Sequence, residues 1–129
     1  MATKEEIFEK VREALVEALA VDEEDVTPEA TLVGDLGAES IDLLDIVYRL
    51  EKAFDIKIDR GELIPEDLTK DGSEFVSEGK LTAKGLEEVK KRIPYAKLDT
   101  FEANPLVQNL ATILTVKDMC YLVETKLGL

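Results

Sequence analysis

Apolar residues recur at helical spacing in three stretches of the chain, over about 3–20, 40–54 and 115–127. Each stretch keeps its polar residues on the opposite side, which is typical of a helix with one buried face. The pattern therefore predicts a helical bundle. Its core-facing residues are Ile7, Phe8, Val11, Ala14, Leu15, Ala18 and Leu19, then Leu43, Ile46, Val47, Leu50 and Phe54, and finally Val116, Met119, Leu122, Val123 and Leu127.

Two of the predicted helices begin with a capping box. Thr3 with Glu6 starts the first helix, and Thr115 with Asp118 starts the last one. In such a box a hydroxyl and a carboxylate each accept a backbone N–H of the first turn, so both helix starts are well defined. The long loop between the first two helices is expected to supply three further core residues, Val26, Leu32 and Leu36.

The predicted helix 40–54 has more apolar residues than one buried face needs. Ile41, Leu44 and Tyr48 stand at positions i, i+3 and i+7 and form a second stripe. Periodicity alone leaves two interpretations open. Either both stripes are buried in one wide core, or the second is an exposed apolar strip of the kind that binds a partner. In the second case the strip is edged by Glu39, Asp42, Asp45 and Glu51.

The helical pattern breaks over residues 63–113, which read as an inserted segment. This stretch holds three of the four prolines, and its nine acidic and seven basic residues nearly balance. We expect a hairpin that turns at Glu78-Gly79 and a short helix over 82–93 capped by Thr82. The stretch after it is ambiguous and reads as a broken helix following Pro105.

The composition fits one domain with one modest core, since 45% of the 129 residues are hydrophobic and 35% are charged. The net charge is −13, and it is unevenly placed: residues 13–48 carry eleven acidic residues and no lysine or arginine. Nucleic acid is excluded as a partner, because binding a phosphate backbone needs clustered basic residues. Such a run of acids can simply be a solvated surface that keeps the protein soluble. Because the acids repel one another and so destabilise a small domain, we favour the second interpretation, in which they attract basic protein partners.

The inventory of reactive groups argues against an enzyme. The chain has no histidine, so no imidazole can activate a serine, and its one cysteine, Cys120, excludes a disulfide framework and a thiolate metal cluster. The N-terminal residues do not form a signal peptide, and no apolar run approaches the roughly 18 residues of a membrane helix. We therefore expect a cytoplasmic protein without membrane insertion.

One acidic stretch partly fits a calcium loop. Asp67, Asp71, Gly72 and Glu78 fall at positions of the EF-hand pattern. Thr69 stands where a carboxylate or amide is expected, and charged Glu74 stands where an apolar residue normally packs in that family. An acidic turn is the better interpretation, and no metal site is predicted.

The stretch "DLGAESIDLLDIVYRLEKAFDIKI" closely resembles the signature of acyl carrier proteins, D-L-G-[AG]-D-S-L-D followed by an amphipathic helix and an F-x-[IV]-x-I tail. The resemblance implies that a separate transferase attaches 4'-phosphopantetheine to the hydroxyl of Ser40. The terminal thiol of this arm then carries acyl groups as thioesters. Glu39 replaces the usual aspartate before the serine, and Ile41 replaces the usual leucine.

The resemblance also implies roles for the residues around Ser40. Asp35 and Leu36 match the loop before the site, and Gly37 and Ala38 match the tight approach to it. The remaining matches are an acidic edge read by basic enzymes and an apolar set that faces partners. The acidic edge comprises Asp42, Asp45 and Glu51, and the apolar set comprises Ile41, Leu44 and Tyr48.

The sequence thus predicts a specialised, stand-alone acyl carrier protein of fatty acid, lipid or related acyl-chain biosynthesis. Its fold is all-α: three main helices with a long first loop. The carrier core spans 1–62 and 114–129, and the insertion of about 63–113 replaces the family's short third helix. The expected partners are a phosphopantetheinyl transferase, acyl-processing enzymes with basic patches and the acyl chain, and the protein is expected to be a monomer.

Two further hypotheses concern the acyl chain and the insertion. The core is expected to double as a sleeve for the chain, because each methylene removed from water is worth about 0.8 kcal/mol. The insertion either enlarges this pocket or adds a docking surface through Lys84, Lys90, Lys91 and Arg92.

Two rival functions stay open. One is an unmodified interaction module in which Ser40 is a plain N-cap. The other is a carrier for amino acids, whose members usually show G-G-[HD]-S where this chain has Gly37-Ala38-Glu39-Ser40.

Overall fold

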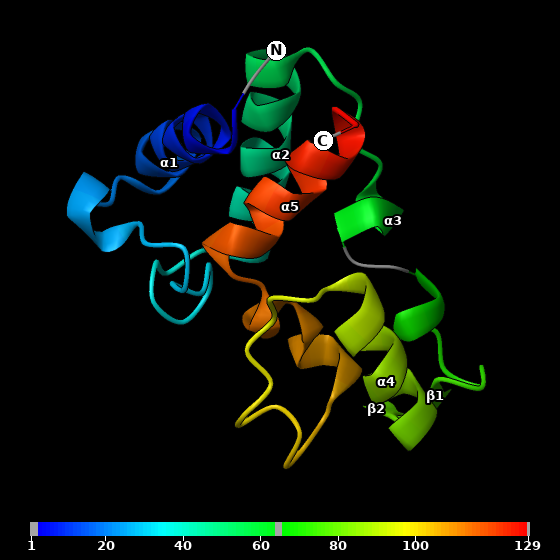
Figure 1. The fold of residues 1–129 in the computed structure, drawn as a ribbon. Helices are drawn as coiled ribbons and strands as arrows, with labels where there is room; N and C mark the ends of the chain where they lie inside the picture. The colour runs from blue at the N-terminus through cyan, green and yellow to red at the C-terminus, as the bar shows by residue number, and fades with distance from the viewer. Residues whose placement is uncertain (1–2, 64–65, 129) are drawn as a thin grey trace.

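The computed structural model describes residues 3–63 and 66–128, without the side chains of Ser40, Arg60 and Glu66. Its regular elements follow one another as Figure 1 shows. The helices are α1 (Lys4–Leu19), α2 (Ser40–Phe54), α3 (Arg60–Leu63), α4 (Ala83–Arg92) and α5 (Val116–Lys126), and the strands are β1 (Val76–Ser77) and β2 (Lys80–Leu81). Three 3₁₀-helices, η1 (Glu23–Asp25), η2 (Glu66–Leu68) and η3 (Val107–Ile113), complete the set within the described residues.

The three long helices form the bundle that the sequence predicts. Helix α1 packs against both α2 and α5, and α5 lies in front of α2 in the view of Figure 1. The capping boxes at Thr3 and Thr115 are both present, and α2 has the predicted bounds. The mainly helical fold is therefore confirmed, with one two-stranded hairpin in the described part of the chain.

The core runs from the bundle into residues 66–113, which we call the 66–113 segment. Buried residues of the bundle and of this segment belong to one apolar cluster. The predicted core residues are buried, except that several at the edges are only partly so: Phe8, Ala18, Leu19, Val47, Phe54, Leu122 and Leu127. The three residues predicted to plug the core from the first loop, Val26, Leu32 and Leu36, are also buried.

The first loop is fixed to the start of α5 by backbone hydrogen bonds. The N–H of Leu32 donates to the carbonyl of Leu114 at 3.0 Å, and the N–H of Val116 donates to the carbonyl of Ala30 at 2.9 Å. These bonds tie the loop that leads into α2 to the start of α5. No described helix is long and apolar enough to span a bilayer.

The 66–113 segment contains the predicted hairpin and the predicted short helix. Glu78 and Gly79 have φ values of 52° and 78°, the left-handed pair that a tight hairpin turn needs. Thr82 caps α4 by accepting the N–H of Gly85 at 3.1 Å. A side chain on Gly85 would come within 2.3 Å of the carbonyl oxygen of Phe75, so helix and hairpin pack closely at this point.

Two parts of the chain differ from the prediction. The stretch after Pro105, which the sequence left ambiguous and which read as a broken helix, forms the 3₁₀-helix η3. Helix α3 was not predicted, since its four residues are too few to show a periodic pattern. A short helix therefore stands between α2 and the 66–113 segment, where the sequence led us to expect the segment alone.

Candidate functional site

Ser40 is the first residue of α2, and Glu39 takes the N-cap position. The N–H of Glu39 donates to the Oδ2 atom of Asp42 at 2.8 Å, which closes the first turn from outside the helix. The interpretation of Ser40 as the N-cap is therefore wrong, because Glu39 already occupies that place in the backbone. The side chain of Ser40 lies outside the described residues.

The loop before Ser40 is fixed by hydrogen bonds between Thr31 and Asp35 and is open at Gly37. Thr31 and Asp35 exchange two hydrogen bonds, each 2.9 Å long, between the backbone N–H of one and the side-chain oxygen of the other. The N–H of Thr31 is the main cause that lowers the pKa of the Asp35 carboxyl. Gly37 has a φ of 74°, and a side chain built there would meet no atom within 4 Å. The space next to Gly37, three positions before Ser40, is therefore open.

The residues present fit a phosphopantetheine group at Ser40. Both chain neighbours, Glu39 and Ile41, are exposed, so an attached group would displace no packed side chain. The first N–H groups of a helix lack partners within the helix, and its N-terminal end carries a partial positive charge. These features favour a phosphate at this position and offset the nearby acids.

The second apolar stripe of α2 is exposed, which settles the alternative that periodicity left open. The exposed fractions are 70% for Ile41, 49% for Leu44 and 54% for Tyr48. Leu43 and Ile46, on the other side of the same turns, are 8% and 1% exposed. The helix therefore buries one stripe and offers the other to solvent.

The acids along this stripe also have structural partners. Asp45 pairs with Arg49 at 3.2 Å, and the same guanidinium bonds to Glu17 of α1 at 2.9 Å. Glu51 accepts the backbone N–H of Ile58 at 2.9 Å, which holds the chain after α2. The sequence had not indicated Arg49 as part of this surface. Its spacing of four residues from Asp45 is the signal that could have revealed the pair.

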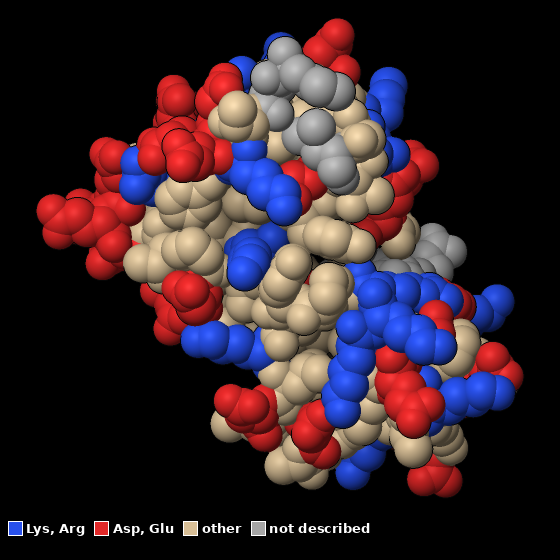
Figure 2. Space-filling model, viewed as in Figure 1, with Lys and Arg blue, Asp and Glu red and all other residues tan. Residues whose placement is uncertain are grey.

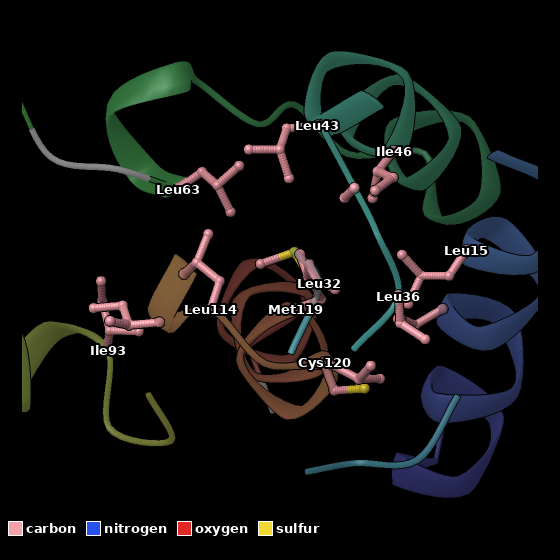
Figure 3. Packing of buried hydrophobic residues seen from close by; sticks show 14 of the residues in the cluster. Leu15, Leu32, Leu36, Leu43, Ile46, Leu63, Ile93, Leu114, Met119 and Cys120 are labelled. Atoms are coloured by element: carbon pink, nitrogen blue, oxygen red, sulfur yellow. The ribbon is translucent and has the colours of Figure 1, made fainter. Parts of the chain in front are cut away.

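A cavity with a volume of about 660 Å³ lies where α3, α5 and the 66–113 segment meet. In Figure 3, Leu63 and Leu114 point toward the same space as Leu43 and Met119. Two ion pairs stand at the cavity: Lys126 with Glu62 at 2.7 Å, and Arg92 with Asp67 at 2.8 Å. Its apolar lining comprises Leu63, Ile93, Leu114, Met119 and Leu122.

Most of the basic residues considered for docking in the 66–113 segment have acidic partners within it. Lys84 pairs with Glu74 at 3.0 Å, and Lys90 pairs with Glu102 at 3.1 Å. Arg92 bonds to Asp67 and to Glu88. Basic and acidic side chains accordingly alternate over this part of the surface in Figure 2, whereas the upper left of the same view is mainly acidic.

The acidic stretch compared with a calcium loop uses its carboxylates for internal bonds. Both carboxylate oxygens of Asp67 accept hydrogen bonds from Arg92, which lower the pKa of Asp67. Asp71 accepts the N–H of Gly79 at 3.2 Å and thereby supports the hairpin turn. Within 3–63 and 66–128, no three metal-ligating side chains gather in one place.

Comparison with known proteins agrees with this geometry. The family described as "Phosphopantetheine attachment site" matches residues 9–67. The acyl carrier protein of Thermotoga maritima is 51% identical over 63 residues, which are 49% of this chain and 78% of the relative. The acyl carrier protein of Petrotoga mobilis is 44% identical over 61 residues, 47% of this chain and 72% of the relative. The chain thus belongs to the acyl carrier protein family, which bears phosphopantetheine and consists of carriers rather than enzymes.

Proposed function

We propose that this protein carries acyl groups as thioesters on a phosphopantetheine arm attached to Ser40, in fatty acid, lipid or related acyl-chain biosynthesis. One observation carries the proposal. Ser40 opens α2 directly after an N-cap residue, between two exposed neighbours, and lies inside the stretch that matches the attachment-site family. Because Glu39 is the cap, helix capping does not account for a serine at position 40.

The attachment needs a separate enzyme, since the chain contains no histidine to serve as a base. The Oγ atom of Ser40 forms the new bond to phosphorus, and the phosphoanhydride bond of coenzyme A breaks. The adenosine bisphosphate half leaves, and the hydroxyl proton passes to the transferase. This chain supplies the positioned hydroxyl and a helix start that favours the resulting phosphodiester.

The exposed stripe Ile41, Leu44 and Tyr48 is the proposed contact surface for the transferase and for acyl-processing enzymes. An apolar strip bordered by acids suits a partner with apolar contacts inside a basic rim. Asp35, Glu39, Asp42, Asp45 and Glu51 form that acidic border. Because several of these carboxylates also bond within the chain, they are already oriented when a partner arrives.

We further propose that residues 1–62 and 114–129 are the carrier core and that 63–113 is inserted into it. The attachment-site match ends at residue 67, and both acyl carrier relatives align with just under half of this chain. The bundle of α1, α2 and α5 is built from the two outer parts, which supports this division.

Mass spectrometry of the intact protein tests the attachment. The chain is incubated with coenzyme A and a promiscuous phosphopantetheinyl transferase, together with Ser40→Ala and the control Ser77→Ala in strand β1. We expect wild type and the control to gain one phosphopantetheine mass and Ser40→Ala to gain none. A wild-type protein that stays unmodified, or a gain that persists in Ser40→Ala, would contradict the proposal.

A further inference from the structure

Lys97 is an exposed cation in the part of the 66–113 segment that follows α4. Lys84, Lys90 and Arg92 of the same segment each pair with an acidic side chain. Within residues 3–63 and 66–128, Lys97 takes part in no such ion pair. Its ammonium group is therefore available to a molecule that approaches from solvent.

Backbone hydrogen bonds place Lys97 close to the loop that leads to Ser40. The N–H of Lys97 donates to the carbonyl of Ile113 at 3.0 Å, and the N–H of Leu32 donates to the next carbonyl, that of Leu114, also at 3.0 Å. Two adjacent residues before α5 thus bind the 66–113 segment and the first loop. The backbones at positions 97 and 32 therefore lie beside the same short stretch of chain.

A second set of contacts connects this part of the segment with Asp35. Thr31 forms a β-bridge with Thr115, and it exchanges two 2.9 Å hydrogen bonds with Asp35. The hydroxyl of Thr115 donates to the carbonyl of Tyr95 at 3.3 Å, two residues before Lys97. The positive charge of Lys97 acts on Asp35, because it adds to the hydrogen bonds from Thr31 in lowering the pKa of that carboxyl.

The surface that Lys97 reaches is otherwise acidic. Residues 13–48, which include the first loop and the start of α2, carry eleven acidic residues and no lysine or arginine. Charges on a protein surface act over about 10 Å at moderate salt. Within that range, Lys97 weakens the attraction of a basic side chain to the loop and attracts an acidic one. The 66–113 segment thereby adds one positive charge at the edge of the acidic surface.

We propose that Lys97 determines which enzymes dock beside Ser40, by favouring a partner that places an acidic side chain next to Asp35 and disfavouring one that places a basic side chain there. This inference rests on the proposed attachment at Ser40 and on docking around it. Like charges brought together in an interface reject wrong partners, while opposite charges speed the approach of right ones. The natural partners of this carrier should therefore hold an acidic residue within an otherwise basic rim.

The test measures kcat/KM for phosphopantetheine transfer to the full-length protein by a promiscuous transferase with a basic docking face. Wild type is compared with Lys97→Gln and Lys97→Glu at low and high salt. We expect kcat/KM at low salt to rise about twofold in Lys97→Gln and about fivefold in Lys97→Glu, and these gains to shrink at high salt. Among single Lys→Glu and Arg→Glu variants of the transferase's docking face, at least one should prefer wild type over Lys97→Glu.

Lys70→Gln and Lys70→Glu are the matched controls. Lys70 is an exposed lysine of the same segment, and its turn follows η2 on the side of Figure 1 away from the first loop. These variants should change kcat/KM by less than the changes at position 97. An NMR titration of the Asp35 carboxyl carbon should show a higher pKa in Lys97→Gln and the wild-type value in Lys70→Gln.

The outcomes separate this inference from the proposed function. Equal effects of the substitutions at positions 97 and 70 overturn the role of Lys97 alone, and so does an Asp35 titration that Lys97→Gln leaves unchanged. A wild-type protein that gains no phosphopantetheine at Ser40 overturns the proposed function instead.

Discussion

Tyr95 and Asp118 join the 66–113 segment to α5. The backbone N–H of Tyr95 donates to the Oδ1 atom of Asp118 at 3.1 Å, and Oδ2 accepts both the N–H and the hydroxyl of Thr115. One carboxylate therefore caps a helix and holds a second part of the chain against it. Asp118 is a buried charged residue in the described chain, which makes its removal costly.

We expect Asp118→Ala to lower the free energy of unfolding by about 1–3 kcal/mol, because buried donors lose their acceptor. Urea unfolding followed by circular dichroism measures the loss, and amide hydrogen exchange at Tyr95 should accelerate. Asp99→Ala, an exposed residue of the same segment, should change stability by less than about 0.5 kcal/mol. Equal effects of the two substitutions would show that the Asp118 bonds contribute little.

The pH dependence of stability should show the burial of Asp118. Desolvation raises its pKa above the ordinary 3.8, against the hydrogen bonds that lower it. A raised pKa means that the folded state binds the proton more tightly than the unfolded state does. Protonation of Asp118 therefore adds to the free energy of unfolding at low pH, and this added stability is lost as the pH rises through the folded-state pKa. The free energy of unfolding of wild type minus that of Asp118→Asn should therefore fall as the pH rises from 3.8 through the raised folded-state pKa. A difference that is flat or grows over this interval would contradict the assignment.

Leu43 and Leu44 are neighbours on α2 with opposite surroundings. Leu43→Ala removes a buried side chain and should cost about 2–5 kcal/mol, whereas Leu44→Ala, at 49% exposure, should cost less than about 0.5 kcal/mol. If the exposed stripe binds the transferase, Leu44→Ala should lower kcat/KM for phosphopantetheine transfer by roughly fivefold, the loss of about 1 kcal/mol of binding. Unchanged kinetics for Leu44→Ala would exclude this residue from the contact.

Two substitutions of Asp42 distinguish its structural role, as acceptor of the Glu39 N–H, from a role of its charge in docking. Asp42→Ala removes the acceptor of the Glu39 N–H and should cost about 1 kcal/mol of stability. Asp42→Asn keeps an oxygen acceptor and should cost only a few tenths, but it removes the charge. If docking uses that charge, the rate of transfer should fall in both variants and should depend less on salt than in wild type.

Cys120 should be unreactive in the folded protein. Burial raises the pKa of its thiol to about 12 from the ordinary 9.0, which leaves about a thousandfold less thiolate than an exposed cysteine would have. Labelling by iodoacetamide near neutral pH should therefore be slow until urea unfolds the chain. Rapid labelling under native conditions would show that the region around Cys120 opens easily.

The helices of the bundle could be predicted because their sequence signals are local. Capping boxes at Thr3 and Thr115 define two helix starts, and the stripe through Ile46 and Leu50 defines the buried face of α2. Only the rival interpretation placed the cap of α2 at Ser40, because serine is a common cap residue. Here the preference is overridden by Asp42, whose carboxylate accepts the N–H of Glu39.

Long-range features were outside the reach of local patterns. Periodicity gives the angle between two stripes but not which one a neighbouring helix covers, so the exposure of Leu44 needed the structure. The cavity combines Leu63, Ile93 and Met119 from three separate parts of the chain, and no local pattern relates them. The pairing of Arg92 with Asp67 likewise joins residues 25 positions apart.

The burial of Cys120 has a chemical consequence for a protein that stores an activated ester. A thioester is lost when a nearby nucleophile attacks its carbonyl carbon, and free thiolates and imidazoles are the most effective such groups in proteins at neutral pH. This chain has no histidine, and its one thiol is buried and protonated. The arm's own sulfur would then be the one reactive thiol on the surface, and a waiting cargo would meet neither a competing thiolate nor an imidazole on its carrier.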